Sequence, residues 1–184
     1  SQPVTATILG ASLATLVSPG ADGLASISLN TIVGGQPGSI EGTATGLTQN
    51  GVSITWHVVS ATQVDGVIGG NVIFSITDNP GDANFTFTLK DNIDNNPSGA
   101  GDSDTDQLSL ANVFVATDTD GDKVVIDAGA SILIENDVPV NNGTSYAIGT
   151  VYEDGLNTAG AVGNAVGEGA KPVTATILGA SLAG

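Results

Sequence analysis

The sequence predicts an all-β fold, organised as a β-sandwich, from three observations. Apolar residues recur with period two along the chain, and valine, isoleucine, threonine and phenylalanine are enriched over helix formers. In the segment FTFTLK, Phe85, Phe87 and Leu89 are expected to face a core and the residues between them to face water. Turn signals such as Asn50-Gly51 separate the apolar segments at a spacing typical of a β-sandwich.

The individual elements follow from the apolar segments and the turns between them. Strands are expected at residues 5–9, 25–32, 52–59, 71–77, 84–89, 108–116 and 123–135, the last with a break near Gly129, and a short one at 146–153. Pro80-Gly81 predicts a further turn. Trp56 and His57 are neighbours on one strand, so one side chain is expected in the core and the other at the surface.

Composition excludes several classes of function. The 184 residues include 19 acidic residues against only 3 lysines and arginines, for a net charge of −16, so neither nucleic acid nor an anionic membrane surface is expected as a partner. Without cysteine there is no disulfide or thiolate site, and any metal must be held by oxygen. No apolar run is long enough to cross a membrane, so membrane insertion is not expected.

One segment occurs twice. Residues 3–14 and 172–183 both read PVTATILGASLA. The repeat is either a motif used twice in one domain or one period of a tandem array, and undrifted identity at a domain-sized offset favours the array. We therefore expect a β-sandwich module at residues 1–138 and the start of the next repeat at 139–184, which either completes the sandwich or pairs with a neighbouring molecule.

The main candidate metal site is the turn Asp118-Thr119-Asp120-Gly121-Asp122. Calcium is a hard cation that takes six to eight oxygen ligands, and alternating aspartates on a turn can supply several of them. Asp118, Asp120 and Asp122 are therefore predicted Ca²⁺ ligands. The alternative is a solvated acidic hairpin that needs Gly121 only for its turn. An EF-hand is excluded, because the loop continues into a strand without a glutamate at the twelfth position.

Two further acidic segments are candidate Ca²⁺ sites. Asp102, Asp104 and Asp106 show the same alternation, and Asp91 and Asp94 lie nearby in the sequence. The alternative for this segment is a loop with hydrated acids.

At the end of the predicted module, Glu135 and Asp137 could hold an ion at the junction between modules. The alternative for that segment is a polar linker.

An enzyme is not expected from these residues. His57 is the only histidine, and no nucleophile or acid that could act with it is apparent in the sequence. Paired carboxylates for glycoside hydrolysis would normally be accompanied by aromatic sugar platforms, and aromatic residues make up only 4% of the chain. The glycine pairs lack the lysine of a phosphate-binding loop.

The chain resembles the tandem extender modules of repeats-in-toxin (RTX) adhesins, very long bacterial surface proteins exported by type I secretion. The similarity is carried by FTFTLKDNID at 85–94, DQLSLANVFVATDTDGD at 106–122, ENDVP at 135–139 and YEDGLNTAG at 152–160. It implies an immunoglobulin-like β-sandwich with Greek-key antiparallel sheets, calcium at Asp118, Asp120 and Asp122, and a location on the outer surface of a Gram-negative cell. The glycine-rich nonapeptide repeat of the wider group is absent.

The expected function is a non-catalytic, calcium-stabilised spacer that projects a distal ligand-binding region of such an adhesin. Its partners would be the neighbouring modules of the same chain, and the repeated segment leaves head-to-tail self-association open. The alternative is a calcium-dependent ligand-binding module, lectin-like or ice-binding. In sequence, the Thr-x-Thr pairs at residues 5 and 7 and at residues 86 and 88 are isolated, which argues against an ice-binding face.

Overall fold

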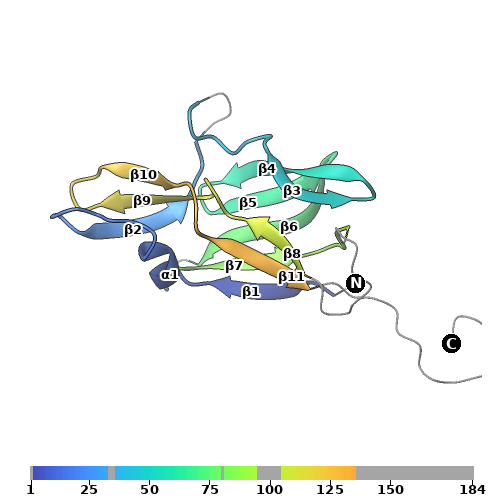
Figure 1. Ribbon diagram of the computed structural model, residues 1–184, viewed down its shortest axis with the longest axis horizontal. Helices are drawn as coiled ribbons and strands as arrows, with labels where there is room; N and C mark the ends of the chain where they lie inside the picture. Colours follow the sequence, from blue (N-terminus) through green and yellow to red (C-terminus); the bar gives the residue numbers. More distant parts are fainter. Residues whose placement is uncertain (1, 33–35, 80, 95–104, 136–184) are drawn as a thin grey trace, which may run out of the picture. The chain divides into compact units, whose positions relative to one another are not determined.

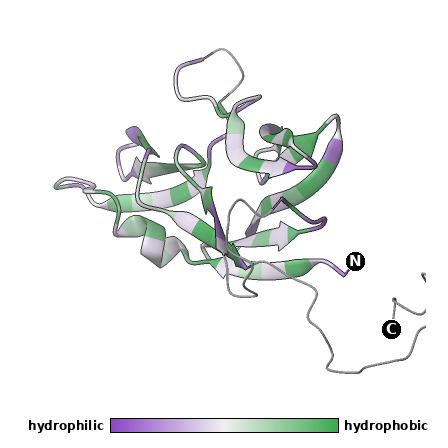
Figure 2. Ribbon diagram, turned by 45° about the vertical axis from the view of Figure 1, so that its right-hand side comes forward, coloured by the Kyte–Doolittle hydropathy of each residue, from purple (hydrophilic) through white to green (hydrophobic). Residues whose placement is uncertain are grey.

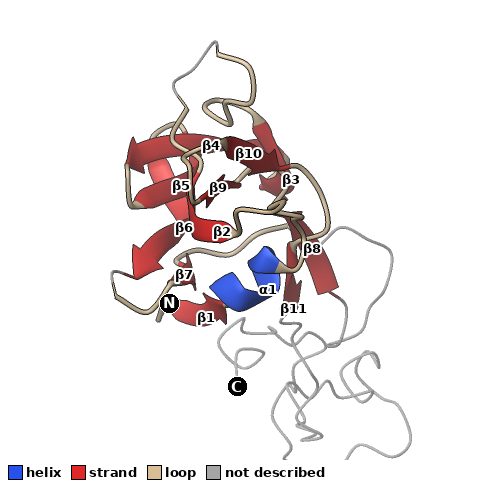
Figure 3. Cartoon of the chain, turned by 90° about the vertical axis from the view of Figure 1, so that its left-hand side faces the viewer, coloured by secondary structure: helices blue, strands red, loops and turns tan. Residues whose placement is uncertain are grey.

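The computed structural model describes residues 2–32, 36–79, 81–94 and 105–135. These residues form eleven strands and one short helix, and they confirm the all-β prediction. The elements are β1 (Val4–Ile8), α1 (Gly10–Ala14), β2 (Leu24–Leu29), β3 (Ala44–Gln49), β4 (Val52–Ser60), β5 (Gln63–Ile68), β6 (Asn71–Asn79), β7 (Asn84–Leu89), β8 (Thr105–Ser109), β9 (Phe114–Asp118), β10 (Lys123–Ile126) and β11 (Ser131–Glu135). Among the described residues α1 is the one helix, and Figure 3 shows it in blue.

The strands pair antiparallel in three sheets (Figure 1). The largest has six strands in the order β1-β7-β6-β5-β4-β3, so that strands β3 to β7 follow one another as a meander and β1 joins its β7 edge. A three-stranded sheet has the order β10-β9-β2, and β8 pairs with β11. Antiparallel sheets are thus confirmed at the level of strand pairing.

All three sheets contribute to one hydrophobic core. Phe74 packs edge-on against Trp56, with ring centroids 5.3 Å apart, inside the six-stranded sheet. Phe85 of that sheet meets Phe114 of the three-stranded sheet at 4.8 Å. In Figure 2 the hydrophobic residues lie mainly along the strands and hydrophilic residues gather at several turns. The core therefore holds β9 and β10, the two strands joined by the acidic turn at residues 118–122.

Several sequence predictions of local structure are confirmed. Phe85 and Phe87 are buried, and Trp56 is in the core while His57 is at the surface. Asn50 and Gly51 have φ values of 51° and 75°, as the predicted hairpin turn requires. Gly129, with φ 87°, separates β10 and β11 where a break was predicted.

Other predictions of local structure were wrong. The segment 108–116 is not one strand, because the chain turns at Asn112 (φ 66°) and forms the end of β8 and the start of β9. Strands β3 and β5 were missed, since Gly46 and Gly66 interrupt their apolar pattern, and so was helix α1. Gly66 is required inside β5 because a Cβ there would overlap the ring of Phe74.

The chain separates into two compact units, residues 1–138 and 139–184. All described residues belong to the first unit. The predicted strand at 146–153 and the second copy of the repeat lie outside the described residues, and the assignment of 139–184 to a following repeat stays a prediction.

Candidate metal site

The turn between β9 and β10 is closed by its own first aspartate. The Oδ1 atom of Asp118 accepts hydrogen bonds from the amides of Gly121, at 3.0 Å, and Asp122, at 2.8 Å. The amide of Asp118 donates to the carbonyl of Asp122 at 3.0 Å. Gly121 has φ 99°, a conformation that favours glycine. The carboxylate of Asp118 therefore shapes the turn and stays at its centre.

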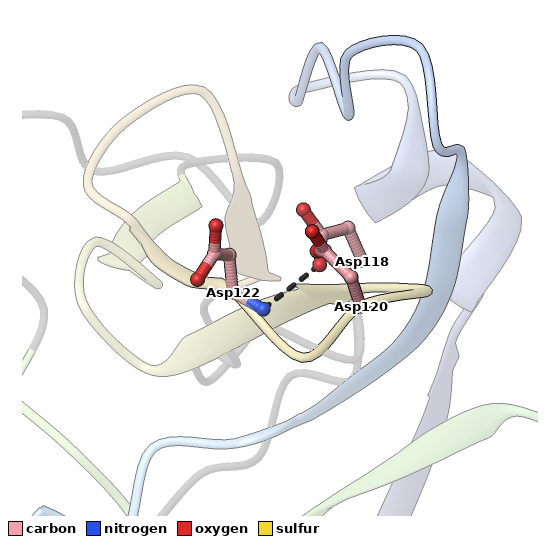
Figure 4. Close-up of side chains that lie close together, drawn as sticks. All are labelled: Asp118, Asp120 and Asp122. Atoms are coloured by element: carbon pink, nitrogen blue, oxygen red, sulfur yellow. Dashed lines mark hydrogen bonds between the residues drawn. The ribbon is translucent and has the colours of Figure 1, made fainter.

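Three carboxylates gather on this turn, as the sequence predicted (Figure 4). One oxygen from each of Asp118, Asp120 and Asp122 lies within 4.8 Å of the others. Asp118 is half-buried, and the other two side chains are exposed. The sequence spacing succeeded here because a tight hairpin returns alternate residues to one side.

The first two carboxylates of the turn perturb each other. A hydrogen bond with the Asp120 side chain, followed by those from the turn amides, holds the pKa of Asp118 below its usual value. The same hydrogen bond and the charge of Asp118 raise the pKa of Asp120. Two carboxylates this close resist full ionisation unless a positive species, a proton or a cation, lies between them. Either species would relieve the repulsion.

The residues of the turn fit a hard divalent cation. Only oxygen donors are present, and both turn amides bond the same oxygen of Asp118, Oδ1. Calcium accepts such a mixed set and completes its shell with water. Asp118, Asp120 and Asp122 are the described residues that would hold it.

The turn is anchored to the loop that precedes β2. Thr119 donates its amide to the carbonyl of Gly23, at 3.2 Å, and its hydroxyl to the carbonyl of Asp22. A cavity of about 200 Å³ lies beside the turn, with Asp118, Asp122 and Lys123 among its lining residues. Sequence reasoning missed this support, because Asp22 and Thr119 are far apart in the chain.

Asp94, considered in sequence as a neighbour of the second candidate site, has a different role. Its carboxylate accepts hydrogen bonds from the Thr48 hydroxyl at 2.7 Å and from the amides of Asn50 and Gly51 at 2.7 and 2.8 Å. These donors, with Gly51 first, lower the pKa of Asp94. The side chain thus clamps the β3–β4 hairpin, and its lone pairs are engaged by protein groups.

The remaining predicted ligands are not assembled by the described residues. Asp106 was expected in a loop, but it lies within β8 opposite Ile134 and is buried. Glu135 ends β11 opposite Thr105. Among the residues described, neither belongs to a cluster of three potential ligands. Asp102, Asp104 and Asp137 lie outside the described residues, so the second and third sites stay predictions.

The imidazole of His57 contacts the carboxylate of Glu41 at the surface, and the two form an ion pair when the imidazole is protonated. Its Nδ1 atom lies 3.1 Å from Oε1 of Glu41, and the other carboxylate oxygen of Glu41 accepts the Val58 amide at 2.6 Å. The Val58 amide, and then His57, lower the pKa of Glu41. This pair connects the segment before β3 to β4 and has the geometry of a structural contact.

Comparison of the chain with protein-family models, with curated proteins and with solved structures finds no match. Within the described part of the chain, no helix has the length and apolar character needed to span a membrane.

Proposed function

We propose that this chain is a non-catalytic spacer module of a long bacterial surface adhesin and that calcium on the β9–β10 turn stabilises it outside the cell. The observation that carries the proposal is the convergence of Asp118, Asp120 and Asp122 on a turn rooted in the core. The antiparallel sheets around one core are compatible with the immunoglobulin-like, Greek-key sandwich that the resemblance implies.

The charge of the chain suggests how calcium would act. With a net charge of −16, the unliganded chain repels itself, and the three carboxylates of the turn concentrate that repulsion at one hairpin. In a low-calcium cytoplasm this would disfavour compaction and suit export of an unfolded chain. Outside the cell, calcium binding to the folded state would shift the equilibrium towards folding by mass action.

Thermal unfolding of the full chain in excess calcium, in excess magnesium and in chelator tests the proposal. We expect calcium, but not magnesium, to raise the melting temperature, and Asp120→Asn to remove a large part of that rise. Asp127→Asn is the matched control, because it removes the same charge from an exposed residue outside the turn. An equal calcium response in the two variants would contradict a site on this turn.

A ligand-binding module is the second candidate, and paired threonines on the β1 edge of the six-stranded sheet favour it. The threonine pairs that are isolated in sequence lie side by side, with Thr5 opposite Thr88 and Thr7 opposite Thr86. Ser75 and Thr77 continue both rows onto β6. The four threonines of β1 and β7 thus form a small array of hydroxyls, exposed on β1 and half-buried on β7, although the two pairs are far apart in sequence. Ser75 itself is buried.

Binding of the full chain to soluble polysaccharides and to ice crystals tests this second candidate. We expect a hydroxyl-dependent ligand to be lost by a Thr7→Val/Thr86→Val variant and retained by Thr31→Val, which lies outside the array. Equal retention by both variants would remove this face from consideration.

A further inference from the structure

The repeated sequence coincides with one structural unit. Its first copy, residues 3–14, begins one residue before β1 and ends at the last residue of α1. The identity stops on both sides of this unit, because Gln2 corresponds to Lys171 and Thr15 to Gly184. The second copy therefore carries the complete sequence of the β1–α1 unit.

The β1–α1 unit packs on a defined surface, formed by the edge of β7 and the part of the core around Leu13, which we call the seat. β1 pairs with β7 along its whole length, from Val4 opposite Leu89 to Ile8 opposite Phe85. The side chain of Leu13, on α1, is buried in the core. Residues 177 and 182 of the second copy are also isoleucine and leucine, so this copy has the apolar side chains that the seat receives.

The joint between β1 and α1 makes the seat selective. Gly10 is buried and donates its amide to Oδ1 of Asn84 at 3.2 Å. A Cβ at this position would overlap the carbonyl oxygen of Ala83, so the seat accepts only glycine here. Residue 179, the equivalent position of the second copy, is glycine.

The unit lies at the margin of the fold. Among the described strands, β1 pairs only with β7, and its first four residues are exposed. Residues 15–23 join the unit to β2 and include Gly20 and Gly23 at positive φ. An edge strand with little buried surface can be exchanged while the rest of the core stays packed.

We propose that the seat on β7 is a docking site for the second copy of this unit from another molecule: residues 172–183 of one chain replace residues 3–14 of the next. The second copy lies in the compact unit 139–184, and the seat lies in the unit 1–138. Such a contact is heterologous and joins molecules head to tail.

Concentration controls this exchange. Both copies have the same sequence and would make the same contacts in the seat, so docking gains no contact energy over the local copy. The local copy is favoured in dilute solution because its short connection gives it a high effective concentration. The exchanged form becomes populated where many chains are held close together, and it does not depend on calcium at the β9–β10 turn.

Disulfide trapping tests the proposal in the full chain, which has no cysteine of its own. Thr5 faces Thr88 across the β1–β7 ladder, and Thr174 is the equivalent of Thr5 in the second copy. Opposed residues on antiparallel strands are close enough for a disulfide. A Thr88→Cys chain mixed with a mass-labelled Thr174→Cys chain is expected to give a mixed disulfide dimer whose yield rises with concentration.

The matched control replaces Thr174→Cys by Ala175→Cys, the equivalent of Ala6, whose side chain points to the opposite face of the sheet. A mixed dimer with Thr174→Cys and little with Ala175→Cys supports docking in register. Equal yields would overturn it. So would a Thr88→Cys/Thr174→Cys chain that cross-links only within one molecule, because the segment would then serve its own chain.

Discussion

Two hairpin turns of the molecule are each organised by an aspartate, but they satisfy it differently. At the β3–β4 turn, Asp94 comes from a distant segment and accepts hydrogen bonds from Thr48, Asn50 and Gly51. At the β9–β10 turn, Asp118 closes the turn from within and has the carboxylate of Asp120 beside it. The carboxylate of Asp94 is stabilised by hydrogen bonds from protein donors, whereas the carboxylate of Asp118 belongs to an acidic cluster.

The difference shows why a count of acids does not identify a metal site. Asp94 stands in a segment with several aspartates, yet its oxygens accept hydrogen bonds from donors that the fold supplies. At the β9–β10 turn, three carboxylates lie close to one another. An ion is useful only where the protein leaves negative charge uncompensated.

The largest loss of stability is expected from a change at Asn30, which is fully buried. Like Asp94 and Asp118, its side chain holds backbone groups of a turn or loop together. Its side chain donates to the carbonyls of Gly38 and Asn112 at 2.7 and 2.6 Å and accepts the Ile32 amide at 3.1 Å. Asn30→Ala leaves these groups without their partner, which costs about 1–3 kcal/mol of unfolding free energy. Urea unfolding measures it, with the exposed Asn71→Ala as control. Equal stabilities would show that the clamp is dispensable.

A smaller loss of stability is expected when Asp94, whose carboxylate is hydrogen-bonded by protein groups, is replaced. Asp94→Ala deletes three hydrogen bonds at the β3–β4 turn, so the melting temperature should fall by the same amount in calcium and in chelator. Because its pKa is lowered in the folded state, Asp94 contributes stability above its unfolded pKa and loses it as the pH falls. The variant should therefore lose less stability than the parent on acidification. A calcium-dependent loss would instead place an ion at Asp94.

For the acidic cluster of the β9–β10 turn, calcium should decide whether Asp120→Asn raises or lowers the melting temperature. In chelator at neutral pH, Asp120→Asn removes repulsion from Asp118 and should raise the melting temperature slightly. In calcium the same change removes a ligand and should lower the melting temperature.

The same residue should also give a pH dependence. Because the pKa of Asp120 is raised in the folded state, its protonation stabilises the fold at low pH, and this contribution is lost as the pH rises through the folded pKa. Melting curves at several pH values, with Asp127→Asn as control, measure both effects. The same sign in both media would contradict the proposed cation site.

The sequence predicted the parts of the fold that depend on local pattern. Alternation at Phe85 and Phe87 identified the buried face of β7, and the spacing of the aspartates identified the acidic turn. It failed where tertiary packing decides. Gly66 reads as a break in a strand until the ring of Phe74 is seen to require it.

Polar contacts between distant segments were equally invisible in the sequence. The apolar residues on both sides of Asn112 read as one strand, although the chain turns there. The partners of Asp94 lie 43 to 46 positions away in the chain, so no local pattern could show that its charge is already compensated.

The smallest effect is expected at the exposed ion pair of His57 and Glu41. The Val58 amide is the main cause of the lowered pKa of Glu41, so loss of the imidazole leaves the carboxylate with its stronger partner. His57→Gln should change the unfolding free energy by about 0–1 kcal/mol, since solvent screens exposed pairs. The difference should shrink further in 1 M salt, where charges are screened within about 3 Å. Glu41→Ala, which also frees the Val58 amide, should cost more at both salt concentrations. If the two variants were equally destabilised and equally sensitive to salt, the ion pair and not the backbone contact would hold this segment to β4.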